Sequence, residues 1–240
     1  MLRLFSVGFA AVFSFLPLGH ARTTPEDRPP VNVVLVHGFT DTGAVFRRLV
    51  AVLEKQGCRC FAPSLSPKTF RYGVHDLTRK LSAEIDAHFG PSEPFVFVGQ
   101  SMGGLVARDY VQNFPGGKRV RTLFLIATAN RGTLWANTSP GGGVRDFAVG
   151  SPFLRSLNAD LHVYRHLPVY AYWTPFDLVV MPSTNSRCAF GRTRRVFSPF
   201  HQSMVVNQVV MADVATRIAV LPPPGTRRAF TPFANAEKGR

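Results

Sequence analysis

Three short apolar runs constrain the fold of this chain more than any other feature of its sequence. They span residues 31–36, 94–98 and 120–126 and read VNVVLV, PFVFV and VRTLFLI. Runs of this kind are typical of strands that are buried on both faces, as in a parallel sheet covered by helices. They predict an α/β architecture.

Segments with helical periodicity lie between these runs. In residues 43–56, the apolar residues Phe46, Leu49, Val50 and Leu53 fall on one helical face. Further helices are predicted at 74–89, 105–114 and 203–220, and further short strands at 58–61, 167–173 and 194–197. Because strands and helices alternate, the sequence predicts a mostly parallel central sheet flanked by helices on both faces.

The composition is that of one folded domain, which we expect to span residues 31–220. Hydrophobic residues make up 45% of the 240 residues and charged residues 18%, which excludes a disordered chain. Beyond the N-terminal segment no apolar stretch reaches the roughly 18 residues of a membrane span. No repeat of fixed period is present, so coiled coils and solenoids are disfavoured.

Both ends of the chain are expected to lie outside this domain. Residues 1–21 have the basic start, the apolar core and the small residues before a cleavage site that are typical of a signal peptide. They predict export, periplasmic or extracellular, after cleavage near Ala21; the alternative is a buried helix or an uncleaved anchor. Residues 22–30 are polar and Pro-rich and predict a linker. Residues 221–240 predict a flexible tail.

The charge of the chain is strongly basic. The formal net charge is +14, and the excess is almost all arginine. The arginines are scattered rather than interleaved with aromatic residues, and no nucleic-acid-binding motif accompanies them, so nucleic acid is not expected as a partner. A solvated basic surface is expected, with attraction to an anionic membrane surface as the alternative.

Cysteine and histidine residues give no metal site. Cys58, Cys60 and Cys188 permit either one disulfide to Cys188 or buried thiols, and both alternatives stay open. The three cysteines are too sparse for structural zinc, and His162 and His166 lack a third ligand. The sequence predicts no metal and no cofactor.

The strongest chemical signal is the motif G-x-S-x-G at residues 99–103. A strand is predicted before it and a helix after it, and this context places a serine on a sharp, exposed turn. Gly99 and Gly103 would let the strand and the helix approach each other there. The helix N-terminus at Met102 would aim its free N–H groups at an oxyanion. Ser101 is therefore the predicted nucleophile, against the alternative of an unreactive serine in a Gly-rich turn.

These residues resemble a known family. Residues 33–39 (VVLVHGF) and 99–104 (GQSMGG) are similar to the first turn and the serine turn of bacterial α/β-hydrolase-fold lipases and esterases. Weaker similarity continues in residues 128–133 and in 150–158. The resemblance covers roughly residues 31–210 and implies an α/β-hydrolase fold. It also implies that His37 is structural and that Phe39, which follows Gly38, supplies a second backbone N–H to the oxyanion.

The acid and the base follow by elimination. In this fold the catalytic residues follow the chain order serine, acid, histidine. Asp177 comes after the predicted strand 167–173, at the carboxyl edge where open α/β sheets place their sites. His201 is the one histidine after Asp177. The alternatives are a carboxylate that stabilises a turn and a surface or capping histidine.

The predicted activity is hydrolysis of carboxylic esters, with triacylglycerol lipase as the preferred subclass and a lipid or ester as the substrate. The same triad would also serve an acyltransferase, a thioesterase or an amidase. A non-enzymatic envelope-binding protein of the same fold is a further alternative. Residues 130–165 are predicted to form an irregular insertion that acts as a lid or cap. Its apolar residues would either line an acyl pocket or pack as an ordinary helix; they are Phe147, Phe153, Leu154 and Leu157.

Overall fold

The computed structural model describes residues 29–65, 72–139 and 141–225. Within them the chain forms a six-stranded sheet in the order β2-β1-β3-β4-β5-β6, in which all neighbours are parallel. The strands are β1 (Asn32–Val36), β2 (Arg59–Phe61), β3 (Phe95–Gln100), β4 (Val120–Ile126), β5 (Val169–Trp173) and β6 (Arg192–Arg195). The predicted parallel sheet is confirmed.

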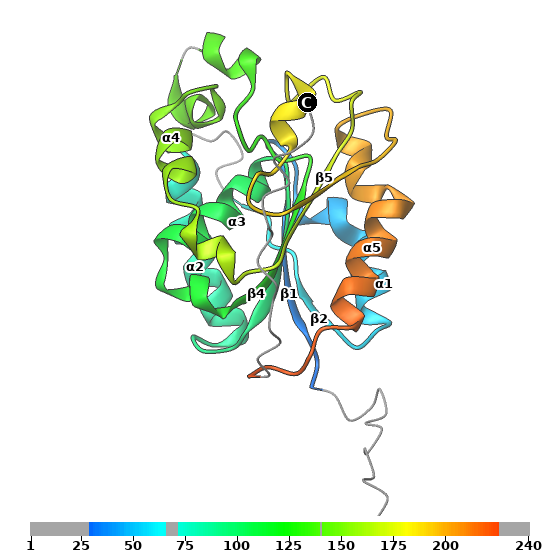
Figure 1. Ribbon diagram of the computed structural model, residues 1–240. Coiled ribbons are helices and arrows are strands. Elements are labelled where there is room, and N and C mark those ends of the chain that lie inside the picture. The colour runs from blue at the N-terminus through cyan, green and yellow to red at the C-terminus, as the bar shows by residue number, and fades with distance from the viewer. Residues whose placement is uncertain (1–28, 66–71, 140, 226–240) are drawn as a thin grey trace, which may run out of the picture.

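Helices cover both faces of the sheet, as predicted (Figure 1). One face carries α1 (Arg47–Glu54) and α5 (Gln208–Ala219), and the other carries α2 (Val74–Phe89), α3 (Met102–Asn113) and α4 (Pro152–Ala159). Short 3₁₀ turns complete the described elements, at Gly43–Phe46, Pro115–Arg119, Leu134–Thr138, Gly142–Phe147, His162–Arg165, Ser183–Ser186 and Gln202–Val206.

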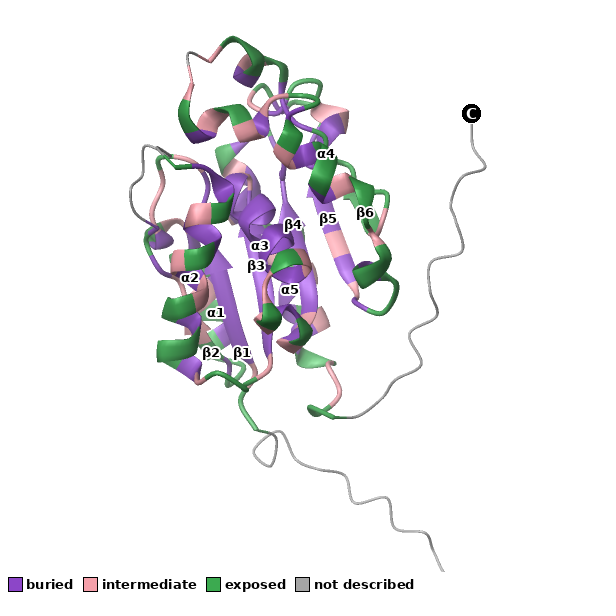
Figure 2. Ribbon diagram, turned by 90° about the vertical axis from the view of Figure 1, so that its left-hand side faces the viewer, coloured by how far each residue is buried: buried purple, intermediate pink, exposed green. Residues whose placement is uncertain are grey.

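Two apolar clusters, one on each face, hold the layers together. Successive strand residues point to opposite faces, so that Val34 and Val36 pack towards α2 and α3 while Val33 and Leu35 pack towards α1 and α5. β1 and β3 are buried at every residue, and β4 is buried at every residue except Arg121 (Figure 2). This double burial is the reason that their sequences are continuously apolar.

Two predicted helices differ in detail from the observed ones. The segment 43–56 begins as a 3₁₀ turn at Gly43–Phe46. Gly43 lies against the backbone of Ala62, where a Cβ would come within 2.0 Å of a carbonyl oxygen. The segment 203–220 divides at Asn207. The Asn207 side chain accepts hydrogen bonds from the N–H groups of Val209 and Val210, and this cap starts α5 afresh.

Arg108 and Asp146 make two of the contacts that fasten the segment 130–165 to the body of the domain. Arg108 of α3, which is fully buried, donates hydrogen bonds to the backbone oxygen of Leu157 and to Oδ1 of Asn158. Asp146 accepts a hydrogen bond of 2.8 Å from the N–H of Val74 at the start of α2. Burial raises the pKa of the Asp146 carboxyl.

The alternative of a disulfide to Cys188 is wrong, and all three cysteines are free. Cys58 and Cys60 pack in the cluster beneath α1 and α5, whereas Cys188 packs in the cluster on the other face of the sheet. Burial raises the pKa of Cys60 and of Cys188 to about 12 in each case, so both remain thiols at neutral pH. Their contribution is to packing.

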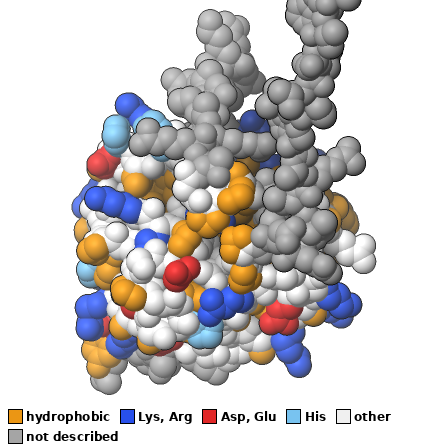
Figure 3. All heavy atoms as spheres, turned by 90° about the horizontal axis from the view of Figure 1, so that it is seen from below, with side chains coloured by type: hydrophobic (Ala, Val, Ile, Leu, Met, Phe, Trp, Pro, Cys, Tyr) orange, Lys and Arg blue, Asp and Glu red, His pale blue; other side chains and the backbone are white. Residues whose placement is uncertain are grey.

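Basic side chains are spread over the surface. On the face seen from below, Lys and Arg side chains form separate groups between apolar and neutral ones (Figure 3). Arginines also mark both edges of the sheet, with Arg59 on β2 and Arg192, Arg194 and Arg195 on β6, all exposed. No helix in the described ranges has the length and apolarity that crossing a membrane requires. The predicted signal peptide, residues 22–28 of the linker and residues 226–240 of the tail lie outside the described residues.

Candidate active site

The topology of the sheet brings distant segments together at one edge. The chain runs from β1 outwards to β2 and then crosses back to β3 on the other side of β1, so that Val36 pairs with Gly99 at the carboxyl ends of β1 and β3. Such a reversal opens a crevice between the loops that follow the two strands. The loop after β1 carries Gly38 and Phe39, and the loop after β3 carries Ser101.

Ser101 lies on a strained turn between β3 and α3. Its φ of 53° and ψ of −117° place it in a backbone region that residues with a side chain rarely adopt. The turn is held by a hydrogen bond of 2.8 Å from the Ser101 N–H to the oxygen of Ile126. A Cβ on Gly103 would lie 2.0 Å from the oxygen of Val36, and one on Gly99 would lie 2.5 Å from the oxygen of Gly103. The motif needs both glycines because its strand and helix touch.

Asp177 and His201 form a buried hydrogen-bonded pair. His201 Nδ1 lies 2.8 Å from Oδ2 of Asp177, and the side chains are only 4% and 0% exposed. The other carboxylate oxygen accepts hydrogen bonds from the N–H groups of Val179 (2.9 Å) and Val180 (2.8 Å). With Oδ1 occupied in this way, Oδ2 is fixed towards the imidazole. Nδ1 carries the proton in this arrangement, which leaves Nε2 as a base.

The loop after β1 is fixed by two polar side chains. Gln100 Oε1 accepts a hydrogen bond of 2.8 Å from the N–H of Gly38. His37 bridges the loop to a distant segment, since its Nε2 accepts from the N–H of Leu65 (2.9 Å) and its Nδ1 lies 2.8 Å from the oxygen of Gly38. Oε1 of Gln100 and both ring nitrogens of His37 thus hold the loop that carries Phe39.

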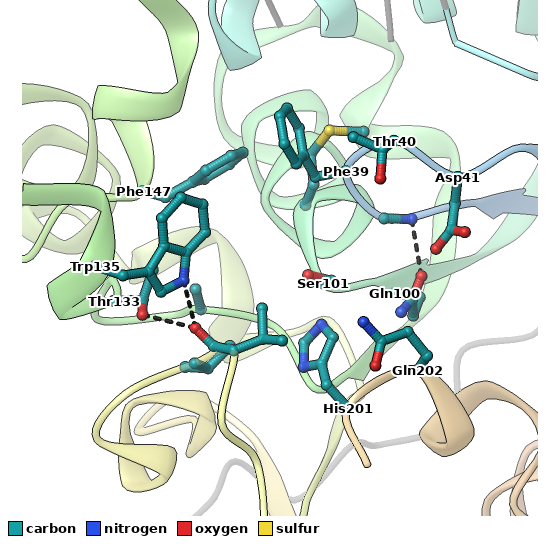
Figure 4. Close-up of a pocket in the computed structure, with 15 residues that line it drawn as sticks. Phe39, Thr40, Asp41, Gln100, Ser101, Thr133, Trp135, Phe147, His201 and Gln202 are labelled. Carbon is teal, nitrogen blue, oxygen red and sulfur yellow. Dashed lines mark hydrogen bonds between the residues drawn. The ribbon is translucent and has the colours of Figure 1, made fainter. Parts of the chain in front are cut away.

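A pocket with a volume of ≈ 150 Å³ joins these parts (Figure 4). Ser101 and His201 both line it, and the His201 ring is directed towards Ser101. Phe39 and Met102 line it as well. Met102 is the first residue of α3, so its N–H has no acceptor within the helix. The predicted residues Ser101, His201, Phe39 and Met102 are thus brought to one cavity, with Asp177 directly behind His201.

One side of this pocket is aromatic. Trp135 and Phe147 from the segment 130–165 line it. The polar atoms on this side are already paired, because Trp135 Nε1 and Thr133 Oγ1 both donate hydrogen bonds to the oxygen of Val179, at 2.5 and 2.8 Å. This side therefore offers an apolar wall. Of the four apolar residues expected either to line a pocket or to pack, Phe147 lines the pocket, Leu154 and Leu157 are in the core, and Phe153 packs against it.

Some pocket residues were not found from the sequence. Gln100 occupies a variable position of the serine motif, and its partner Gly38 is 62 residues away. Trp135 lies in an irregular segment with no periodicity. Asp41 follows the first turn and precedes Ser101, so the chain order of the triad does not indicate it. The only available signal was the position of Asp41 directly after a predicted strand and turn.

Two absences are limited to the described part of the chain. No group of three or more His, Cys, Asp or Glu side chains that could hold a metal ion occurs there. His162 and His166 lie at the 3₁₀ turn that precedes β5, outside the pocket that contains Ser101.

Comparison with known proteins identifies the family to which this fold belongs. Residues 31–150 match the model of the family described as alpha/beta hydrolase fold. Comparison of the chain with curated proteins gives no match. Among solved structures, Aspergillus fumigatus lipase B is 15% identical with a TM-score of 0.66, and the match covers 81% of this chain and 54% of that one. This chain therefore spans about half the length of that lipase.

Two further structures are similar along most of their length. Bacillus licheniformis lipase BlEst2 in its mature form has 16% identity and a TM-score of 0.64, with 81% of this chain and 93% of that chain covered. The thioesterase domain from the curacin biosynthetic pathway has 15% identity and a TM-score of 0.54, with 81% and 92% covered. At these identities the likeness shows the fold.

Proposed function

Because this chain belongs to the alpha/beta hydrolase fold family, we propose that it is a serine hydrolase that cleaves carboxylic esters with Ser101, His201 and Asp177. One observation carries the proposal. Ser101, held at a φ of 53°, and His201 line the same cavity. His201 is hydrogen-bonded to the buried Asp177, which does not line the cavity. This arrangement fits the three roles of nucleophile, general base and orienting acid.

In the proposed reaction, Ser101 Oγ attacks the ester carbonyl carbon while His201 Nε2 accepts the hydroxyl proton. Asp177 holds the ring and stabilises its protonated form. His201 then gives the proton to the leaving alcohol oxygen, which produces an acyl-enzyme and the free alcohol. Water attacks the acyl-enzyme with His201 again as base, and the acid is released.

The negative charge of the tetrahedral intermediate needs donors on the far side of the carbonyl. We assign this role to the backbone N–H groups of Phe39 and Met102. Met102 is suited to it by its place at the N-terminus of α3, and Phe39 by the loop that Gln100 and His37 fix. Loss of one such donor typically lowers the rate by about 100- to 1000-fold.

Lipid or medium- to long-chain acyl esters, with triacylglycerol as the preferred subclass, are the proposed substrates. The aromatic wall of Trp135 and Phe147 suits an acyl chain. A volume of ≈ 150 Å³ is small beside the roughly 300 to 1,000 Å³ of typical ligand pockets. A longer chain would therefore leave the pocket and need apolar surface around its mouth.

Exposed apolar side chains lie on the loops that carry the acid and the base. Phe176 and Leu178 flank Asp177 with exposures of 49% and 79%, and Phe197 and Phe200 precede His201 with exposures of 76% and 66%. We call these four residues the apolar rim. The rings of Phe176 and Phe197 meet edge to face at 5.4 Å. Exposed aromatic residues beside the basic strand β6 favour contact with a lipid surface, and export to the periplasm or the medium remains part of the proposal.

The test uses the full chain and its Ser101→Ala variant on p-nitrophenyl esters from acetate to palmitate. We expect turnover by the parent chain, loss of turnover in the variant, and an optimum at medium or long acyl chains. Thioester and amide substrates, and an added alcohol acceptor, separate hydrolysis of esters from the thioesterase, amidase and acyltransferase alternatives. Folded protein without turnover of any ester would refute the proposal.

A further inference from the structure

The side of the pocket opposite the aromatic wall is polar. Thr40, Asp41 and Gln202 line it. Figure 4 shows Asp41 and Gln202 on one side of Ser101, and Trp135 and Phe147 on the other. The two walls come from different parts of the chain, since the polar wall follows β1 and β6 while the aromatic wall belongs to the segment 130–165. The pocket therefore has a polar side and an aromatic side, and Ser101 lies between them.

The polar wall differs from the aromatic wall in how its polar atoms are used. On the aromatic side, the side chains of Trp135 and Thr133 both donate their hydrogen bonds to the oxygen of Val179. The side chains of Thr40, Asp41 and Gln202, by contrast, make no hydrogen bond or ion pair with any part of the chain that the structure describes. Within the described residues this half-buried carboxylate has no cationic partner, although the protein carries a net charge of +14. Its hydrogen-bonding capacity is available to a ligand.

The reaction geometry decides which part of an ester meets this wall. His201 must deliver a proton to the leaving oxygen, so the alcohol part lies beside His201. Gln202 is the next residue in the chain, and Asp41 faces the same side of the pocket. The acyl part then extends towards the aromatic wall. We propose that Thr40, Asp41 and Gln202 form a polar subsite that binds free hydroxyl groups of the alcohol part of the substrate. Such a subsite narrows the proposed acyl-ester substrates from triacylglycerol to partial esters of a polyol, such as a monoacylglycerol.

Hydroxyl groups fit this set of side chains better than a cation does. A carboxylate accepts hydrogen bonds, and the hydroxyl of Thr40 and the amide of Gln202 both donate and accept, which matches neighbouring hydroxyls of a polyol. A quaternary ammonium group is recognised on aromatic faces, and the aromatic wall of Trp135 and Phe147 lies on the opposite side of Ser101. This inference rests on the proposed ester hydrolysis and names the alcohol that is released.

The test compares two esters with the same acyl chain, 1-monohexanoylglycerol and propyl hexanoate, and measures kcat/KM for each with the full chain. We expect a preference for the glycerol ester of about tenfold or more, since hydrogen bonds to a charged group are strong. In Asp41→Ala the ratio should fall to near 1. In Glu84→Ala, which removes an exposed carboxylate of α2 away from the pocket, the ratio should stay at the parent value.

The outcomes separate this inference from the proposed function. Equal rates on the two esters by the parent chain would overturn the polar subsite and leave ester hydrolysis standing. Hydrolysis of neither ester would overturn both. A preference for choline hexanoate over the glycerol ester would replace the polyol by a cationic alcohol. An unchanged ratio in Asp41→Ala would remove Asp41 from the subsite.

Discussion

The centre of the pocket and its rim are built in opposite ways. At the centre, Asp177 has both carboxylate oxygens occupied and Gln100 holds the loop of Gly38. By contrast, Asp41 on the polar wall is unpaired within the described chain, and Phe197 of the apolar rim is 76% exposed. Hydrogen bonds of this kind hold the side chains in one arrangement, and a reaction requires such a fixed arrangement. Polar or apolar groups without a partner in the chain are available to a substrate. The contrast therefore assigns chemistry to the centre and substrate choice to the polar wall and the apolar rim.

The largest expected effect on activity comes from replacing Asp177, the acid of the proposed triad. In Asp177→Asn, the amide that faces His201 favours the wrong tautomer of the ring. We expect kcat on a soluble p-nitrophenyl ester to fall by about 10⁴-fold, as for the equivalent change in serine proteases. Stopped assays with high enzyme concentration would measure the residual rate. A loss of less than tenfold would mean that Asp177 is not the orienting acid.

A smaller effect is expected one layer further out, at Gln100. The substitution Gln100→Leu leaves the buried N–H of Gly38 without its partner and loosens the loop that carries Phe39. We expect kcat to fall by about 10- to 100-fold, from the cost of an unsatisfied buried donor. KM should change little, because Gln100 acts through the loop.

The matched control is Gln112→Leu in the same helix–strand unit. Gln112 of α3 donates hydrogen bonds to the oxygens of Leu157 and Asp160, so its loss should lower the melting temperature rather than kcat. If both substitutions lower kcat equally, the effect of Gln100 is general destabilisation.

The rim is tested by making it polar. In the double variant with Phe197→Ser and Phe200→Ser, we expect activity on emulsified triacylglycerol to fall by about tenfold, because each exposed ring would contribute apolar burial at a lipid surface. Activity on a dissolved short-chain ester should be nearly unchanged. Equal losses on both substrates would place these residues with the centre instead.

The smallest expected effect is on stability and concerns the contact between Asp146 and Val74, which joins the segment of the aromatic wall to α2. Asp146, beside Phe147, has a raised pKa because it is buried. The folded state therefore binds its proton more tightly than the unfolded state, and its contribution to stability is full below about pH 3.9 and is lost as the pH rises through the raised pKa. Asp146→Asn keeps an acceptor for the N–H of Val74 without this loss.

We expect the melting temperature of Asp146→Asn to exceed that of the parent by about 2 °C at pH 7. The difference should vanish towards pH 4, measured by calorimetry in the same buffers. A lower melting temperature at pH 7 would show that the charge on Asp146 strengthens the contact with α2.

Local patterns predicted the frame of this molecule well. Residues 74–89 form α2 as expected, and the run 120–126 is β4. These elements follow from periodicity and double burial, which a sequence displays directly. The 3₁₀ turn at Gly43 differs from the predicted helix start, and the close approach of Gly43 to Ala62 has no local signal in the sequence. The break at Asn207 had a local signal, since asparagine is a strong helix cap.

The candidate site could be predicted from the sequence only in part. Ser101 came from a motif, and Asp177 and His201 came from chain order after elimination; their catalytic roles remain predictions. The contacts of Gln100 with Gly38 and of Asp146 with Val74 join residues 62 and 72 positions apart. Pairs of this kind depend on how the layers pack, and no spacing in the sequence encodes them. The pocket walls were hidden for the same reason.

The arginines at the two edges of the sheet affect how copies of this protein behave together. An open sheet ends in strands whose outer backbone groups can pair with a strand of another molecule, which is a common route to aggregation. Here one outer strand, β6, carries three exposed arginines, and the other, β2, carries one. Two approaching edges would bring like charges together. Concentrated solutions at low salt should thus resist strand-to-strand aggregation, and added salt should weaken that protection.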